Sequence, residues 1–251
     1  MPPLVGQSDN PAVPAVQAVD TLISESPYFH TDGAGRSANW SMAPDVLRFL
    51  WSCLKPSMPT LETGSGQTTV TFAIAGTHHV CVTPQRAEAE RIRSYCRDHG
   101  IEDTITFIHD SSDIALASGR GIPEVMEFVL IDGAHRFPFP ILDWHFTERK
   151  VPIGGIVALD DYLTPSVRIL HDFLLDEDEW ELIQLFWGTS FFRRTGHRPI
   201  EFGDDDYHMS QNMNKPRRHP LRHPRYFARG LRSRVEAFLS RLNNHGASSS
   251  L

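Results

Sequence analysis

Apolar residues along this chain occur in two recurring patterns. The segment 41–55 carries Val46, Leu47, Leu50, Trp51 and Leu54 at the spacing of one helix face. Other segments, such as the residues VLI that precede Asp132, are short and continuously apolar, which is typical of strands buried on both faces. The sequence therefore predicts helices and buried strands rather than a helical bundle.

After residue 56 the predicted strands and helices alternate. The predicted strands are 58–62, 78–84, 103–110, 127–133, 154–162, 180–188 and 189–196. The predicted helices between them are 67–76, 84–100, 111–119, 138–150 and 164–178. This order predicts the α/β fold class, with a Rossmann-like doubly wound sheet that is mostly parallel and has an antiparallel closing strand.

The pattern divides the chain into three parts. Residues 1–40, rich in Pro and Ala at their start, are expected to form a flexible arm, and residues 41–195 the α/β domain. Residues 196–251 are expected to form an irregular basic appendage that ends in a helix at 231–242.

Composition narrows the class of protein. Hydrophobic residues make up 40% of the chain and charged residues 22%, which is ordinary for a globular protein. No apolar run is long enough to span a bilayer, and the N-terminus lacks the pattern of a signal segment, so we expect a cytoplasmic protein. Cys53, Cys81 and Cys96 are expected to be buried and reduced.

The charge is unevenly distributed. The net charge is -7, but residues 215–241 hold nine Lys or Arg residues against one Glu. This basic tail is either a solvated segment or a docking site for an anionic partner. A nucleic-acid substrate is unlikely because the rest of the chain is acidic. The oligomeric state cannot be read from the sequence.

Ligands of open α/β sheets bind beyond the carboxyl ends of the strands, so residues that end strands are the informative ones. The residues LETGSGQT follow the first strand of the domain and place Gly64 and Gly66 before a helix. Glycines there allow a tight turn and close approach of the backbone to a ligand. Glu62 would repel a diphosphate, which argues against NAD and suits a ligand with an ammonium or sulfonium group.

The segments LETGSGQTT, IDGAHRF and GGIVALDDY together resemble the class I S-adenosylmethionine-dependent methyltransferases, in particular small-molecule O-methyltransferases of the catechol and macrocin type. The resemblance covers about residues 41–195. It implies S-adenosylmethionine as cofactor and a small-molecule acceptor, such as a sugar or another secondary metabolite. The residues that it assigns to the cofactor site are Glu62, Thr63, Gly64, Ser65, Gly66, Thr83, Asp110, Ser111 and Asp132. Thr83 stands where the family usually has the acid that binds the ribose.

The same resemblance implies a divalent cation. Its ligands would be Asp132, Asp160 and Asp161, and Mg²⁺ is the ion that three carboxylates suit best. Without a cation, three carboxylates at adjacent strand ends would raise one another's pKa values. The competing interpretation is that Asp160 caps a helix and Asp161 faces solvent.

Asp132 and His135 are the predicted catalytic residues, as general bases that take the proton of the acceptor hydroxyl. Two alternatives remain open: a metal-independent methyltransferase with His135 as its base, and a non-catalytic protein that binds the cofactor or serves as a scaffold.

Overall fold

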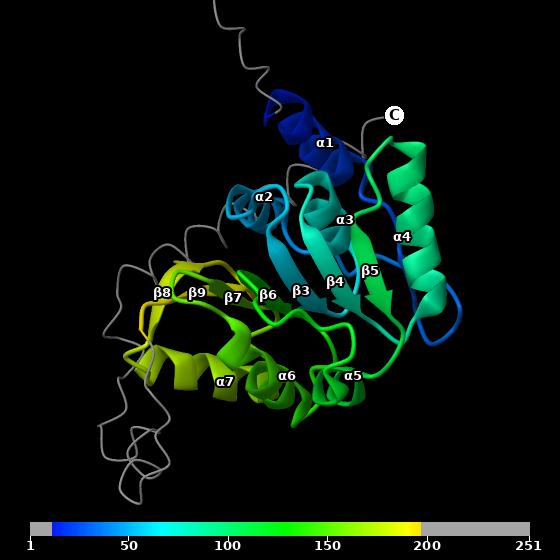
Figure 1. Cartoon of the computed structure of the whole chain (residues 1–251). Helices are drawn as coiled ribbons and strands as arrows, with labels where there is room; N and C mark the ends of the chain where they lie inside the picture. The colour runs from blue at the N-terminus through cyan, green and yellow to red at the C-terminus, as the bar shows by residue number, and fades with distance from the viewer. Residues whose placement is uncertain (1–11, 197–251) are drawn as a thin grey trace, which may run out of the picture.

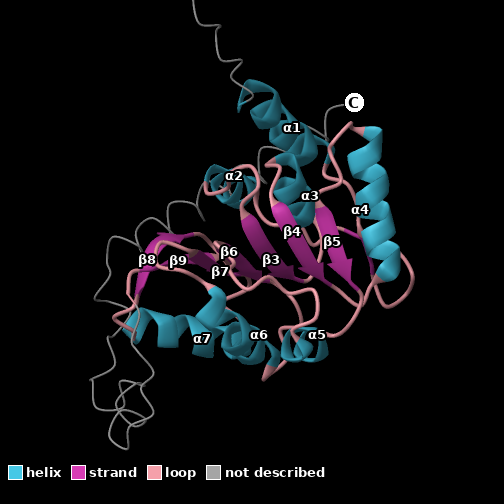
Figure 2. Cartoon of the chain, viewed as in Figure 1, coloured by secondary structure: helices cyan, strands magenta, loops and turns pink. Residues whose placement is uncertain are grey.

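A computed structural model describes residues 12–196 of the chain, and the basic tail with its predicted terminal helix lies outside these residues. Its centre is a seven-stranded sheet in the order β5-β4-β3-β6-β7-β9-β8 (Figures 1 and 2). The strands are β3 (Pro59–Thr63), β4 (His78–Val82), β5 (Ile105–Ile108), β6 (Phe128–Ile131), β7 (Ile156–Leu159), β8 (Trp180–Leu185) and β9 (Ser190–Arg194). Strand β9 runs antiparallel to both of its neighbours, while β3 to β7 are parallel. The predicted fold class is confirmed.

Helices cover both faces of the sheet (Figure 1). On one side lie α1 (Ala12–Glu25), α2 (Pro44–Ser52), α3 (Gln67–Ile74) and α4 (Arg86–Asp98). On the other lie α5 (Ser112–Ser118), α6 (Phe139–Thr147) with the short 3-10 turn η1 (Glu148–Lys150), and α7 (Pro165–Asp176). No helix of the described residues is long and apolar enough to cross a membrane.

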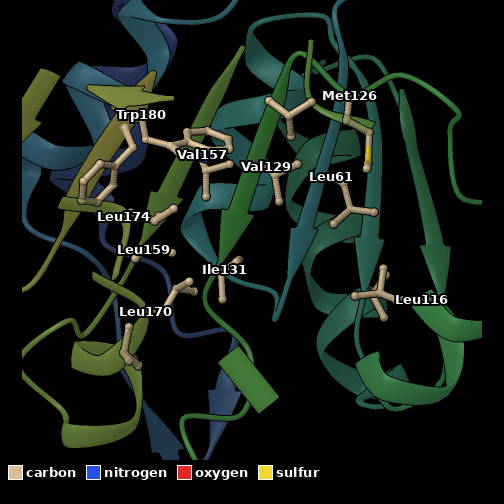
Figure 3. Close-up of a cluster of buried hydrophobic side chains, with 14 of the residues drawn as sticks. Leu61, Leu116, Met126, Val129, Ile131, Val157, Leu159, Leu170, Leu174 and Trp180 are labelled. Atoms are coloured by element: carbon tan, nitrogen blue, oxygen red, sulfur yellow. The ribbon is translucent and has the colours of Figure 1, made fainter. Parts of the chain in front are cut away.

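The continuous apolar strands are explained by burial on both faces. In β6, Phe128 and Leu130 belong to the hydrophobic cluster under α2 and α3. Val129 and Ile131 belong to the cluster under α5 to α7, which Figure 3 shows in close-up. Because successive side chains of a strand point to opposite faces, a strand covered on both sides must be apolar at every position.

The prediction of a flexible arm over residues 1–40 differs from the structure for residues 12–40. Residues 12–25 form α1, which buries Val19 and Leu22, and Leu22 packs with Val70 of α3 and Ile92 of α4. The apolar positions of α1 recur at helical spacing, so packing against the domain stabilises a helix that Pro and Ala content obscures. A two-stranded hairpin of β1 (His30–Thr31) and β2 (Ser37–Ala38) follows.

The order of strands places a crevice between β3 and β6. From β3 the chain proceeds outward through β4 and β5, and then returns to β6 on the opposite side of β3. This reversal of strand order is the point at which open α/β sheets bind ligands. The segments that follow β3 and β6 are the ones that the sequence singles out.

Candidate functional site

The turn after β3 lies directly against the end of β6. Gly64 has φ +93, and a β-carbon built on it would stand 2.2 Å from the main-chain oxygen of Asp132. Asp132 in turn donates its main-chain N–H to the carbonyl of Thr63 at 3.1 Å. Only glycine allows both this φ and this contact, so the predicted glycine turn serves to bring two strand ends together.

The turn leads into the N-terminus of α3. The N–H of Gly66 donates to the hydroxyl of Thr69 at 2.9 Å, and α3 begins at Gln67. The first N–H groups of a helix lack partners within the helix and attract electronegative groups of a ligand. The backbone from Ser65 to Gln67 therefore forms a polar rim beside the crevice.

Glu62 lies behind this turn and does not line the crevice. Its side chain is 1% exposed, and its carboxylate accepts hydrogen bonds from the hydroxyls of Thr68, at 2.8 Å, and Thr69. The imidazole Nε2 of His79 lies 3.2 Å from the same carboxylate. Glu62 thus joins β3 to α3 and β4 in the structure.

His135 lies between two carboxylates beyond β6. Its Nε2 is 3.6 Å from Oδ1 of Asp132, and its Nδ1 is 3.2 Å from Oδ2 of Asp161. The nearby carboxylate of Asp132 raises the pKa of His135 above its usual value, and the charge of Asp161 adds to this effect. Ser166 donates its hydroxyl to the carbonyl of His135 and so fixes the loop.

The carboxylates of Asp132 and Asp160 both have raised pKa values. Burial raises the pKa of Asp132, and the negative charges of Glu62 and Asp161 raise it further. Burial also raises the pKa of Asp160 well above its usual value, and the charge of Asp132 is the next cause. Thr189 donates a hydrogen bond to Asp160. The predicted gathering of carboxylates at adjacent strand ends is thus present.

These acids do not form a metal cage. Within residues 12–196, no group of three or more His, Cys, Asp or Glu side chains is arranged to hold a metal ion. Asp161 has φ +52 and a side chain that is 57% exposed and directed to His135. Because the imidazole takes the place between Asp132 and Asp161, the structure does not support the magnesium site predicted at Asp132, Asp160 and Asp161.

The crevice is a pocket of about 390 Å³. Its lining includes six of the site residues predicted from the sequence and a set of residues from the N-terminal part of the chain. The residues that line it are His30, Trp40, Ser41, Met42, Ser65, Gly66, Gln67, Thr68, Asp132, Gly133, His135, Asp160 and Asp161. Carboxylates and the imidazole of His135 therefore line the pocket from the strand ends, and the indole of Trp40 lines it from the N-terminal part of the chain.

Six predicted cofactor residues lie outside this lining, namely Glu62, Thr63, Gly64, Thr83, Asp110 and Ser111. Thr83 directly follows β4 with its side chain buried, and its hydroxyl oxygen lies 3.3 Å from that of Ser65. Asp110 and Ser111 follow β5, two strands from β3, where Asp110 accepts a hydrogen bond from the N–H of Ser111 at 2.8 Å.

The N-terminal wall of the pocket is absent from the sequence-based prediction. His30 lies 3.2 Å from the position of a β-carbon on Gly66, and its ring stacks on Trp40 with centroids 5.1 Å apart. The indole of Trp40 is 63% exposed. One signal was available, since Trp40 is a large aromatic residue within a polar stretch, but nothing local indicates which surface it would face.

Comparison with known proteins agrees with this architecture. Residues 61–162 match the family model described as a methyltransferase domain. No curated protein sequence matches the chain. Among solved structures, cofactor-bound Rv0187 from MTB has a TM-score of 0.54 at 14% identity, over 76% of this chain and 100% of the other.

Two further solved structures share the fold. The O-methyltransferase TomG from Streptomyces achromogenes, solved with SAM and involved in tomaymycin synthesis, has a TM-score of 0.54 at 17% identity, over 77% of this chain and 93% of that one. A methyltransferase from Geobacter sulfurreducens has a TM-score of 0.50 at 17% identity, with the same coverage of 77% and 93%. At these identities the likeness establishes a common fold.

Proposed function

Because this chain is a class I S-adenosylmethionine-dependent methyltransferase whose family match spans residues 61–162, we propose that it methylates a hydroxyl group of a small molecule. The acceptor belongs to the class of sugars and other secondary metabolites. The observation that carries this proposal is the contact of the glycine turn with Asp132, at the point where the strand order reverses. The imidazole of His135, flanked by carboxylates, lines the pocket at the same point.

The glycine turn fits the cofactor. Ser65, Gly66 and Gln67 line the pocket at the start of α3, and Gly66 has no side chain that would stand between the backbone and a ligand. Backbone N–H groups at a helix start suit the carboxylate of an amino acid. The carboxylate of Asp132 suits its ammonium group. These residues would hold the methionine portion of S-adenosylmethionine.

The reaction needs a base as well as alignment. When bound, S-adenosylmethionine would supply a methyl group on a positively charged sulfur. The acceptor oxygen would displace that sulfur from the methyl carbon, so that the C–S bond breaks as the C–O bond forms. His135 takes the proton of the acceptor hydroxyl at Nε2 or Nδ1, and Asp132 and Asp161 orient the ring and stabilise the imidazolium that results. The residues that line the pocket would hold the acceptor in place for this transfer.

The open side of the pocket provides room for the acceptor. Trp40 presents an exposed indole there, next to Ser41 and Met42. An indole packs on the apolar face of a sugar or of an aromatic ring, while a hydroxyl of the same ligand reaches His135. This arrangement favours an acceptor that has a flat apolar face and a hydroxyl at its rim.

A second version of this function uses a divalent cation. It is supported by burial, which raises the pKa of both Asp132 and Asp160, and by the charge of Asp132, which raises the pKa of Asp160 further. Oxygen ligands suit Mg²⁺, which would reduce the repulsion between these acids. In that version Asp161 and His135 have to separate, because their side chains now pair with each other.

The function is tested by calorimetry and product analysis. Titration with S-adenosylmethionine and with S-adenosylhomocysteine should show binding of both, and incubation with a panel of hydroxylated small molecules should give a methylated product by mass spectrometry. Binding without any transfer would favour the non-catalytic alternative, and absence of binding would refute the proposal. The cytoplasmic location, the anionic partner of residues 215–241 and the division at residues 40 and 195 stay proposals from the sequence.

A further inference from the structure

The end of β4 lacks the acid that would bind a ribose. Thr83 stands there, with its hydroxyl engaged by Ser65 at 3.3 Å and by the N–H of Gln85 at 3.2 Å. A nucleoside bound at the strand switch presents two adjacent ribose hydroxyls, and dinucleotide-binding sheets recognise such hydroxyls with the carboxylate of an Asp or Glu. If this pocket binds a nucleoside, another residue has to provide that carboxylate.

Glu88 lies in the right place. It belongs to the first turn of α4, five residues after Thr83, and its Oε2 accepts a hydrogen bond from the hydroxyl of Ser65 at 2.9 Å. Its Oε1 is 3.4 Å from Nδ1 of His30. Both partners of Glu88 line the pocket, and the Glu88 side chain is only 12% exposed. The side chain therefore reaches from the helix back to the rim of the glycine turn.

The carboxylate of Glu88 has unused hydrogen-bonding capacity. An ionised carboxylate can accept about four hydrogen bonds. The described neighbours of Glu88 provide one hydroxyl donor, Ser65, and one imidazole, His30. A pair of ribose hydroxyls would supply two further donors, and bonds from hydroxyls to a charged oxygen are among the stronger ones in proteins.

The attachment of the N-terminal segment to α4 does not require the carboxylate of Glu88. Arg91, one turn further along α4, already ties this segment down: its Nε donates to the carbonyl of Phe29 at 2.7 Å, and its Nη2 to the hydroxyl of Thr31 at 3.3 Å. The segment that carries His30 is thus attached to α4 without the help of Glu88.

We infer that Glu88 is the ribose-binding carboxylate of this methyltransferase, displaced from the strand end to the first turn of α4. The inference rests on the proposed function, because it assumes that the pocket binds S-adenosylmethionine. Ser65 and His30 would position the carboxylate, and Thr83 would support it through Ser65.

The test compares ligands that differ only in a ribose hydroxyl. Calorimetry on the full chain measures the affinity of wild type and Glu88→Gln for S-adenosylhomocysteine and for its 2′-deoxy and 3′-deoxy analogues. In the wild type, loss of a recognised hydroxyl should weaken binding about 10- to 100-fold. In Glu88→Gln, S-adenosylhomocysteine itself should bind that much more weakly, and the difference between it and the deoxy analogues should largely disappear. Glu90→Gln, an exposed acid on the same helix, should behave as the wild type.

The outcomes are distinguishable. If Glu88→Gln weakens all three ligands equally, or none of them, Glu88 does not bind the ribose although the cofactor site stands. If the wild type binds no S-adenosylhomocysteine, the proposed function fails first and the inference with it. Circular dichroism confirms folding of each variant. If Glu88→Gln is unfolded, Glu88→Asp takes its place: it keeps the charge but shortens the side chain, and it too should reduce the discrimination between hydroxyl and deoxy ligands.

Discussion

The α-carbon of Gly64 faces the main-chain carbonyl of Asp132, and a β-carbon at Gly64 would lie 2.2 Å from that oxygen. Since the φ of Gly64 is +93, Gly64→Ala imposes both a steric clash and an unfavourable backbone conformation. We expect this variant to unfold at lower denaturant concentration and to lose binding of S-adenosylhomocysteine. Gly33→Ala is the control, because a β-carbon there meets nothing within 4 Å. Wild-type stability and binding in Gly64→Ala would contradict the close contact.

His135 should govern the pH dependence of methyl transfer. The imidazole must be neutral to accept a proton, and Asp132 raises its pKa above the usual 6.5. The value of kcat/KM should therefore increase as pH rises through a midpoint above 6.5. In Asp132→Asn the midpoint should move to lower pH, while Asp161→Asn, whose acid is 57% exposed, should shift it less. His135→Gln should reduce kcat/KM about 100- to 10,000-fold.

Chelation distinguishes the two versions of the mechanism. Because the imidazole of His135 pairs with Asp161 at 3.2 Å and no metal cage is present among residues 12–196, we expect activity to survive exhaustive treatment with a chelator. Asp160→Ala should then alter stability more than turnover, since the half-buried carboxylate of Asp160 accepts a hydrogen bond from Thr189. Activity that disappears with chelator and returns with Mg²⁺ would establish the cation-assisted version instead.

Trp40 should contribute to acceptor binding and not to cofactor binding. Its indole is exposed in the pocket and stacks on His30, so Trp40→Ala removes an apolar surface without opening the core. We expect KM for the acceptor to rise roughly 3- to 10-fold, with unchanged affinity for S-adenosylhomocysteine. Tyr28→Ala is a matched control, because Tyr28 is 59% exposed in the same segment and does not line the pocket. Equal effects of both changes would argue against a specific role of Trp40.

Asp143 of α6 should make stability depend on pH. Its carboxyl group is 1% exposed, and burial raises its pKa to about 6 from 3.8. Since the folded state holds the proton more tightly than the unfolded state, stability should fall as pH rises from about 4 to about 6. Asp143→Asn removes this penalty, and at about pH 7.5 it should be more stable than the wild type by roughly 2 to 3 kcal/mol. Urea unfolding at about pH 4 and about pH 7.5 measures this, and a constant difference at both pH values would exclude titration of Asp143 as the cause.

The sequence alone determined the order of elements, the predominantly parallel sheet with its antiparallel strand, and the strand ends that carry the polar residues. These features depend on local periodicity and on turn residues such as Gly64, which can be read from neighbouring positions. Even so, the sequence did not predict α1, because its apolar positions lie within a segment rich in Pro and Ala. The helix is stabilised when Leu22 packs against Val70 and Ile92, and these contacts come from distant parts of the sequence.

The tertiary structure decided which polar residues face the pocket. Glu62 points to α3 and not into the pocket, because side chains of a strand alternate between faces and the hydroxyls of Thr68 and Thr69 donate hydrogen bonds to its carboxylate. His30, Trp40 and Glu88 reach the same rim from distant segments, which only packing brings together. Local pattern fixes the backbone path of an α/β sheet, whereas the direction and partners of each side chain depend on residues far away in the sequence.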